Sequence, residues 1–261
     1  MPILAPGSVR VVPNKDAFRS SVILAEVIGG RKQGNPGVRN RMGQEIEIKL
    51  RVESEKTLKQ ALKRLRARPV GAGTGRVHEW NVIFDTPQGG LAKHGQLLRI
   101  RTETPAAPRK KGKHAIGPRP RTVLTFKKPS IPPPDATTSS QKSQRHKIRE
   151  EIEVEVADAA VLATIFEGLG MNGWFRYEKY RTTFRLPALT TWAEGLLIEL
   201  DETPIGTFVE LEGPPTAIDR AAQELGYARR DYIMKSYLAL YLDDCRRRGR
   251  DPQDMLFASA K

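Results

Sequence analysis

The feature that most constrains this fold is a strict alternation of charged and apolar residues over positions 45–52, EIEIKLRV. Successive side chains of a β-strand point to opposite faces, so the octapeptide predicts a strand with one charged face and one apolar face. A single strand of this kind is typical of the surface of an antiparallel sheet, with its charges in solvent. The alternation recurs along the chain, however, and the repetition changes this interpretation.

Seven further segments are predicted as strands, at residues 77–85, 96–103, 122–128, 149–156, 173–186, 195–202 and 205–212. Helical spacing of apolar residues predicts helices at 54–68, 158–170, 215–225 and 232–248, with a short helical turn at 91–94. Each half of the chain is therefore a β-α-β-β-β unit. We expect an α+β fold in which the two halves form an eight-stranded, mostly antiparallel closed β-barrel, or tunnel, with helices packed outside.

The helices determine which strand faces point outward. Helices cover apolar surface, so the apolar strand faces must lie beneath them and the charged faces must point into the barrel. Unpaired buried ions each cost several kcal/mol, so such an interior must be wet and must hold a ligand. Clustered carboxylates favour hard divalent cations such as Mg²⁺ or Mn²⁺. Clustered Arg and Lys favour phosphate oxygens, and the pattern therefore predicts a site for a metal-complexed polyphosphate.

Charged and turn motifs occur in a fixed order between about residues 43 and 245. They are Glu45-x-Glu47-x-Lys49, Phe84-Asp85-Thr86, Arg99-x-Arg101, Lys127, Arg149-x-Glu151-x-Glu153, Lys179-x-Arg181, Asp201, Glu210-x-Glu212 and Lys235-Ser236-Tyr237. In this order they resemble the motifs of the CYTH family, also called triphosphate tunnel metalloenzymes. That family includes class IV adenylate cyclases, thiamine triphosphatases and inorganic triphosphatases.

The resemblance implies roles for individual residues. The carboxylates implied as ligands of Mg²⁺ or Mn²⁺ are Glu45, Glu47, Glu210 and Glu212, with Asp201 or Glu153 near them. The cations implied as a phosphate clamp are Lys49, Arg99, Arg101, Lys127, Arg149, Lys179 and Arg181. Lys49 and Lys179 are the candidate catalytic residues, and Lys179 is the candidate general base. One metal would orient the phosphates, and a second could activate water or assist cyclisation.

Three functions compete on these grounds. The first is a metal-dependent hydrolase of a small-molecule triphosphate, with inorganic triphosphate as the default substrate. The second is a class IV adenylate cyclase that converts ATP to cyclic AMP, although no aromatic pair in the sequence marks an adenine pocket. The third is a non-catalytic polyphosphate- or nucleotide-binding module, which would need the clamp but not the carboxylates. The sequence leaves the substrate, the metal and the oligomeric state open.

The net charge of +14 would suggest nucleic-acid binding if it lay on a folded surface. Nearly all of the excess lies in residues 1–44, 104–121 and 129–147, which are rich in Pro, Gly or Ser. We therefore expect no specific nucleic-acid partner. The predicted organisation is a flexible basic tail (1–43), a tunnel domain (44–248) with flexible inserts at 104–121 and 129–147, and a C-terminal tail (249–261).

Compartment and membrane association follow from what the sequence lacks. Cys245 is the only cysteine, which excludes a disulfide framework. The chain has no apolar run of about 18 residues and no signal-peptide pattern at its N-terminus. We expect a cytoplasmic protein without a membrane partner.

Several charged residues near strand ends are left out of the predicted site. Arg51, Glu155 and Glu199 are expected to form ordinary salt bridges at the barrel rim. Asp85 is expected to cap the turn before Pro87 rather than to bind metal.

Overall fold

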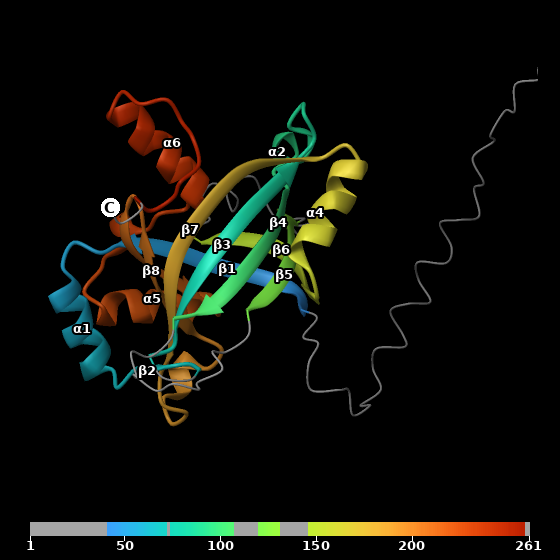
Figure 1. The fold of residues 1–261 in the computed structure, drawn as a ribbon. Coiled ribbons are helices and arrows are strands. Elements are labelled where there is room, and N and C mark those ends of the chain that lie inside the picture. The colour runs from blue at the N-terminus through green and yellow to red at the C-terminus, as the bar shows by residue number, and fades with distance from the viewer. Residues whose placement is uncertain (1–40, 72–73, 107–119, 131–145, 259–261) are drawn as a thin grey trace, which may run out of the picture. The chain divides into compact units, whose positions relative to one another are not determined.

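The computed structural model describes residues 41–71, 74–106, 120–130 and 146–258 (Figure 1). Most of the predicted flexible tail and inserts, namely residues 1–40, 107–119, 131–145 and 259–261, lies outside the described residues. None of the helices in the described ranges combines the length and the apolar composition that a membrane crossing requires.

The barrel contains eight strands. They are β1 (Arg41–Arg51), β3 (Arg76–Asp85), β4 (Leu97–Pro105), β5 (Arg121–Pro129), β6 (Lys147–Val156), β7 (Asn172–Arg185), β8 (Leu197–Thr203) and β9 (Gly206–Glu212). Their order is β7-β3-β4-β5-β6-β1-β9-β8, and pairing of β7 with β8 closes the ring. Every described strand pair is antiparallel, and a ninth strand of two residues, β2 (Arg68–Pro69), pairs with the C-terminal end of β7. The predicted closed barrel is confirmed.

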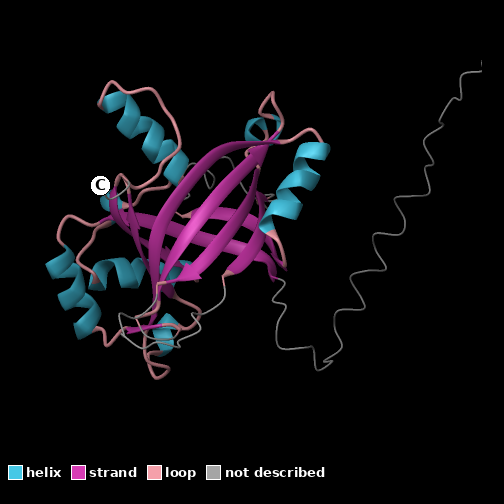
Figure 2. Ribbon diagram, in the orientation of Figure 1, coloured by secondary structure: helices cyan, strands magenta, loops and turns pink. Residues whose placement is uncertain are grey.

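Helices connect and cover the strands (Figure 2). They are α1 (Glu55–Arg64), α2 (Gly90–Lys93), α4 (Ala159–Gly168), α5 (Pro215–Glu224) and α6 (Tyr237–Arg247), with 3-10 turns at Thr191–Ala193 and Arg229–Asp231. The prediction of a last helix from residue 232 was wrong at its start. Ser236 is the N-cap, accepting a hydrogen bond from the Ala239 amide, and Ile233 instead pairs through its backbone with Lys49.

The main apolar core lies outside the barrel wall, as expected if helices cover the apolar faces of the strands. Its strand side chains come from the outward faces of β1, β8 and β9, namely Ile48, Leu50, Ile198, Val209 and Leu211. Its helical side chains come from α1 and α5, namely Leu58, Ala61, Leu62, Ala217, Ile218, Ala221, Ala222 and Leu225. Burial of these groups is the dominant stabilising contribution on this side of the molecule.

The second apolar layer lies between α4 and the outward face of β3 and β4. Phe166 packs there against Phe84 and Ile100. Ile165 in α4 and Leu169 at its C-cap are also apolar, yet they are 52% and 67% exposed. The helix is apolar on both sides, so spacing alone could not identify the side that contacts the barrel.

The chain returns to the barrel after α6. Met255 is almost fully buried, its amide donates to the Arg176 carbonyl, and its carbonyl accepts from the Glu178 amide. The segment around Met255, which the sequence suggested was part of a C-terminal tail, therefore packs against β7.

Candidate active site

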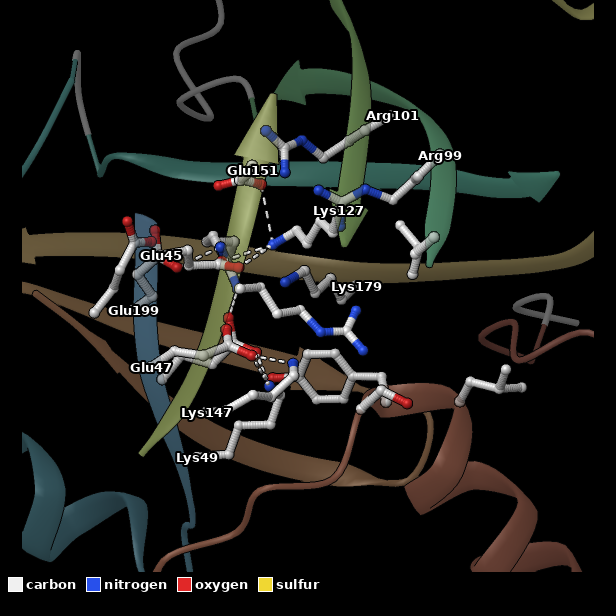
Figure 3. Close-up of a pocket in the computed structure, with 18 of the residues that line it drawn as sticks. Glu45, Glu47, Lys49, Arg99, Arg101, Lys127, Lys147, Glu151, Lys179 and Glu199 are labelled. Carbon is white, nitrogen blue, oxygen red and sulfur yellow. Dashed lines mark hydrogen bonds and ion pairs between the residues drawn. The ribbon is translucent and has the colours of Figure 1, made fainter. Parts of the chain in front are cut away.

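A charged cavity lies inside the barrel (Figure 3). All of the predicted site residues except Asp201 line it. The lining also contains residues outside the predicted set: Lys147, Glu151, Glu199, Tyr177, Ser236, Tyr237, Ile83, Leu97, Leu197 and Leu238. Eight lysine or arginine and seven glutamate side chains face one another across the barrel, so the expected charged interior is present.

The carboxylates of β1 and β9 are held around Lys49. Its ammonium lies 3.1 Å from Oε1 of Glu47 and 2.9 Å from Oε1 of Glu210, and Lys147 pairs with Glu47 from β6. Burial and Glu210 disfavour the Glu47 carboxylate, but Lys49, Lys147 and Lys127 outweigh them and lower its pKa. Burial likewise disfavours the Lys49 ammonium, yet Glu210 and Glu47 raise its pKa. Both groups are therefore charged at neutral pH.

The opposite wall carries Lys127 on β5 and two arginines on β4. Lys127 lies 2.6 Å from Glu45 and 3.0 Å from Glu151. Arg99 donates hydrogen bonds to the Tyr177 hydroxyl at 3.1 Å and to Thr125 at 3.3 Å.

Some polar atoms on this wall lack protein partners. Arg101 lies 3.3 Å from Glu153 through Nη2. Within the ranges that the structure describes, Nε of Arg99 on this wall is buried without a hydrogen-bond partner, as are both amide atoms of Asn81 on the neighbouring strand β3, outside the cavity lining. Buried polar groups are normally satisfied, so this wall is suited to accept water or the oxygens of a ligand.

Asp201 lies behind the cavity. It is fully buried, and its carboxylate accepts hydrogen bonds from Lys179 at 2.8 Å, from Nε and Nη2 of Arg181, and from the Tyr237 hydroxyl at 2.6 Å. The sequence suggested that Asp201 lies near a metal, but its oxygens are already occupied. The geometry is that of a carboxylate that positions Lys179 and Arg181.

Lys179 does not suit the role of general base. Burial and Arg181 disfavour its ammonium, but Asp201, Glu79 and Glu210 outweigh them and raise its pKa. A base must be deprotonated at the working pH, and Lys179 is not. Glu79 lies 3.5 Å from the Lys179 ammonium, and Lys179 and Arg181 overcome burial to lower the pKa of Glu79 to about 2.

Three of the four residues left out of the predicted site lie away from the cavity lining. Asp85 caps the turn as expected, because its carboxylate accepts hydrogen bonds from the amides of Thr86, Leu91 and Ala92. Glu155 pairs with Arg121 at 3.0 Å. The Arg51 guanidinium lies 4.6 Å from the centre of the Phe208 ring and donates a hydrogen bond to the Ile205 carbonyl, and it forms no rim salt bridge with any residue that the structure describes.

Glu199, the fourth, was wrongly assigned to the rim. It is 7% exposed, lines the cavity and pairs with Arg181. Burial and the nearby carboxylates of Glu210, Asp201 and Glu212 raise the pKa of Glu199 to about 8, even though Arg181 opposes the shift.

Comparison with protein families identifies the architecture. A family model described as the CYTH domain matches residues 43–237. The chain belongs to the CYTH family. Among curated protein sequences, none matches the chain significantly.

Solved structures show the same fold at low sequence identity. One is a Vibrio parahaemolyticus protein with a provisional assignment as an adenylate cyclase, 19% identical, with 77% of this chain and 98% of that one covered and a TM-score of 0.55. A Pyrococcus horikoshii protein is 22% identical, with 77% and 99% covered and a TM-score of 0.53. A hypothetical protein from Pyrococcus furiosus is 22% identical, with 75% and 99% covered and a TM-score of 0.51. These likenesses concern the fold alone.

The CYTH barrel contains functional candidates that sequence reasoning missed. Lys147 has the same strand parity as Arg149 and Glu151, so alternation could have found it. Glu79 has the parity of the inward face of β3, but Asn81 and Ile83 interrupt the charged pattern there. Tyr237, in the first turn of α6, belongs to the Lys235-Ser236-Tyr237 motif, but the motif gave it no role, and no periodicity in the strands points to it.

The carboxylates that line the cavity of this CYTH chain are the ligand type that hard cations prefer, although their side chains do not converge on one point. Glu45 and Glu47 on β1 and Glu210 and Glu212 on β9 share the inward face, and Glu47 and Glu212 are direct cross-strand partners. Among the residues described, no three histidine, cysteine or carboxylate side chains converge as a metal cluster. Lys49 and Lys147 lie against these carboxylates instead. All-oxygen donors of this kind match Mg²⁺ or Mn²⁺.

Proposed function

We propose that the protein is a divalent-metal-dependent hydrolase of triphosphate substrates bound inside the barrel. The observation that carries this proposal is the concentration of clamp cations and carboxylates around one cavity. A protein that only stabilised its fold would gain little from these charges, because burying them costs free energy. A metal-complexed triphosphate would compensate both sets of charges.

The binding step rests on an exchange of partners. Lys49, Lys127 and Arg181 each pair with carboxylates in the structure. When a triphosphate enters, these cations turn to its non-bridging oxygens, and the carboxylates that they leave become available to a metal. Arg99 and Arg101 offer forked donors from β4, and Asp201 keeps Lys179 and Arg181 aimed at the same space.

The metal would be held by Glu47, Glu210 and Glu212, with Glu45 beside them. When bound, it supplies Lewis-acid polarisation of the phosphates and lowers the pKa of water. The chain itself binds and orients the phosphates and neutralises charge as the anhydride bond breaks. Glu210 and Glu47 raise the pKa of Lys49, so Lys49 enters the partner exchange as an ammonium, which can donate to a phosphate oxygen but cannot accept a proton.

A second candidate function is cyclisation of ATP to cyclic AMP, in the class IV adenylate cyclase reaction. The phosphate clamp and the carboxylates would serve either reaction. The apolar side chains at one end of the cavity, including Leu97 and Leu238, favour a substrate with an organic part and so keep the cyclase reading open. A non-catalytic binding module is less well supported, because it would not need the carboxylates.

The test is phosphate release and cyclic AMP formation from inorganic triphosphate, thiamine triphosphate and ATP, each with Mg²⁺, with Mn²⁺ and with chelator. We expect metal-dependent phosphate release, reduced on the order of 100-fold in Glu47→Gln. The matched control is Glu150→Gln, since Glu150 pairs with Lys128 outside the cavity lining, and its activity should stay within about twofold of wild type. Cyclic AMP from ATP would favour the cyclase, and tight binding without turnover would leave the binding module.

Metal binding has its own readout. We expect Mn²⁺ in the presence of inorganic triphosphate to bind with a measurable calorimetric affinity that falls at least tenfold in Glu210→Gln. Unchanged Mn²⁺ affinity in that variant would remove Glu210 from the metal site, whatever its effect on turnover.

A further inference from the structure

Two lysine side chains converge on a single carboxylate oxygen inside the barrel. The ammonium groups of Lys49 and Lys147 both donate to Oε1 of Glu47, Lys49 at 3.1 Å, and Figure 3 shows both side chains reaching Glu47. Lys49 also lies 2.9 Å from Oε1 of Glu210. Two positive charges therefore already occupy carboxylates that the proposed function assigns to a divalent cation.

Lys147 approaches Glu47 from the strand that carries none of the proposed metal ligands. Glu47 faces Lys147 on β6 across one edge of β1, and it faces Glu212 on β9 across the other edge. The preceding residue, His146, pairs at 2.9 Å with Asp219 of helix α5. The start of β6 is therefore anchored, and only the flexible four-carbon stem of Lys147 has to move for its ammonium to leave Glu47.

Lys147 is the cavity lysine whose charge is least well compensated. Burial and the ammonium groups of Lys49 and Lys127 lower the pKa of Lys147, although Glu47 opposes this shift. The other three cavity lysines, Lys49, Lys127 and Lys179, have raised pKa values, because the carboxylates beside them outweigh burial. Like charges crowd Lys147, so its ammonium leaves its carboxylate at a lower cost in free energy than the other three do.

We propose, on the basis of the function proposed above, that Lys147 is an internal counter-ion that occupies Glu47 until a triphosphate draws it away, so that metal and triphosphate bind cooperatively. Without a triphosphate, releasing Glu47 to a metal would leave the Lys147 ammonium in a buried site without an anion, which costs free energy. A triphosphate supplies that anion, and Glu47 then becomes available. Each ligand therefore raises the equilibrium affinity of the other by the same factor.

The competing explanation is that Lys147 is only one more cation of the phosphate clamp. Both explanations predict weaker triphosphate binding when the charge of Lys147 is removed. They differ in the protein without any phosphate, because only a counter-ion at Glu47 competes with a metal there. The decisive quantity is therefore the affinity for the metal alone.

The experiment is a calorimetric titration of the full chain with Mn²⁺ in phosphate-free buffer, for wild type, Lys147→Met and Lys147→Arg. We expect Lys147→Met to bind Mn²⁺ about tenfold more tightly than wild type, and Lys147→Arg, which keeps the charge, to stay within about threefold of it. Arg101→Met is the matched control, because it removes one positive charge from the opposite wall, where Arg101 pairs with Glu103 and Glu153. It should raise the Mn²⁺ affinity by less than about threefold.

Two results would overturn the inference and leave the proposed function standing. One is an Mn²⁺ affinity in Lys147→Met that rises no more than in Arg101→Met, and the other is an equal rise in Lys147→Arg, which would exclude the charge as the cause. If Mn²⁺ binds no form of the protein even with inorganic triphosphate present, the proposed metal dependence fails, and the inference fails with it. If Lys147→Met does not fold, as judged by circular dichroism, Lys147→Gln removes the same charge, keeps a donor for Glu47 and is judged by the same criteria.

Discussion

The two faces of β1 are both buried, yet for opposite reasons. Ile48 and Leu50 point outward and are inaccessible beneath the helices, whereas Glu47 and Lys49 point inward and are only 5% and 3% exposed. The outer face gains free energy by leaving water, and the inner face loses it. Burial therefore does not distinguish a stabilising residue from a functional one, but the chemical type of the buried group does.

The largest expected effect is on the outer face. Leu211→Ala removes an inaccessible side chain from the core beneath α5, and we expect a loss of about 2–5 kcal/mol in the free energy of unfolding. Urea denaturation measures it. Leu189→Ala is the control, because that side chain is 95% exposed and should change stability by less than about 0.5 kcal/mol. Equal effects would remove the distinction between core and surface.

The next effect is the free-energy cost of ionising a buried carboxylate on the inner face. Glu199 has its pKa raised to about 8 in the folded protein, against 4.5 as its ordinary value, so the folded state resists its ionisation. Its contribution to stability is full below pH 4.5 and is lost as pH rises toward 8.

Between pH 6 and pH 9, the unfolding free energy of wild type should fall by about 1–3 kcal/mol as Glu199 ionises. Glu199→Gln cannot ionise at this position and should not show that fall. Unfolding free energies at the two pH values measure it. Glu150→Gln should keep the wild-type pH dependence, and an unchanged dependence in Glu199→Gln would contradict the assigned environment.

A smaller effect is expected at Tyr237, whose hydroxyl hydrogen-bonds Asp201 behind the cavity. Tyr237→Phe removes the hydrogen bond to Asp201 but leaves Lys179 and Arg181 in place, so we expect a loss of about 1 kcal/mol in stability. The KM for the triphosphate should rise several-fold with little change in kcat. Tyr241→Phe serves as the control, because the Tyr241 hydroxyl bonds the backbone near Asp254 rather than Asp201. A matching KM change in that variant would show that the effect is not specific to Asp201.

The smallest effect is expected at an apolar side chain outside the barrel that is not buried. Ile165 belongs to an apolar helix outside the barrel but is about half exposed, whereas the adjacent Phe166 is buried. Ile165→Lys should change the free energy of unfolding by less than about 0.5 kcal/mol. Phe166→Ala should cost about 3 kcal/mol. Thermal melts of the two variants measure the difference, and a large loss in Ile165→Lys would show that this face is covered.

The sequence determined strand parity well, because alternation is a local property. It therefore identified the eight strands, the inverted barrel and most of the charged lining. It could not place Asp201 behind Lys179, since both residues have inward parity and only three-dimensional packing decides which one reaches the cavity. It also could not predict that Tyr237 and Leu238 close the site, because a helix that crosses the end of a barrel has no signature in the strands that it covers.

The strand order also bears on how the chain reaches this structure. β1 does not pair with the strands that follow it directly but lies between β6 and β9, so Glu47 is opposite both Lys147 and Glu212. The repeated pattern of the two halves therefore does not make two autonomous folding units. During synthesis the first strand must wait, unpaired on one side, until nearly the whole barrel has been made. Contacts of such long sequence separation slow folding. We expect a nascent chain that ends before β9 to remain open, and its barrel to close only when that strand is released.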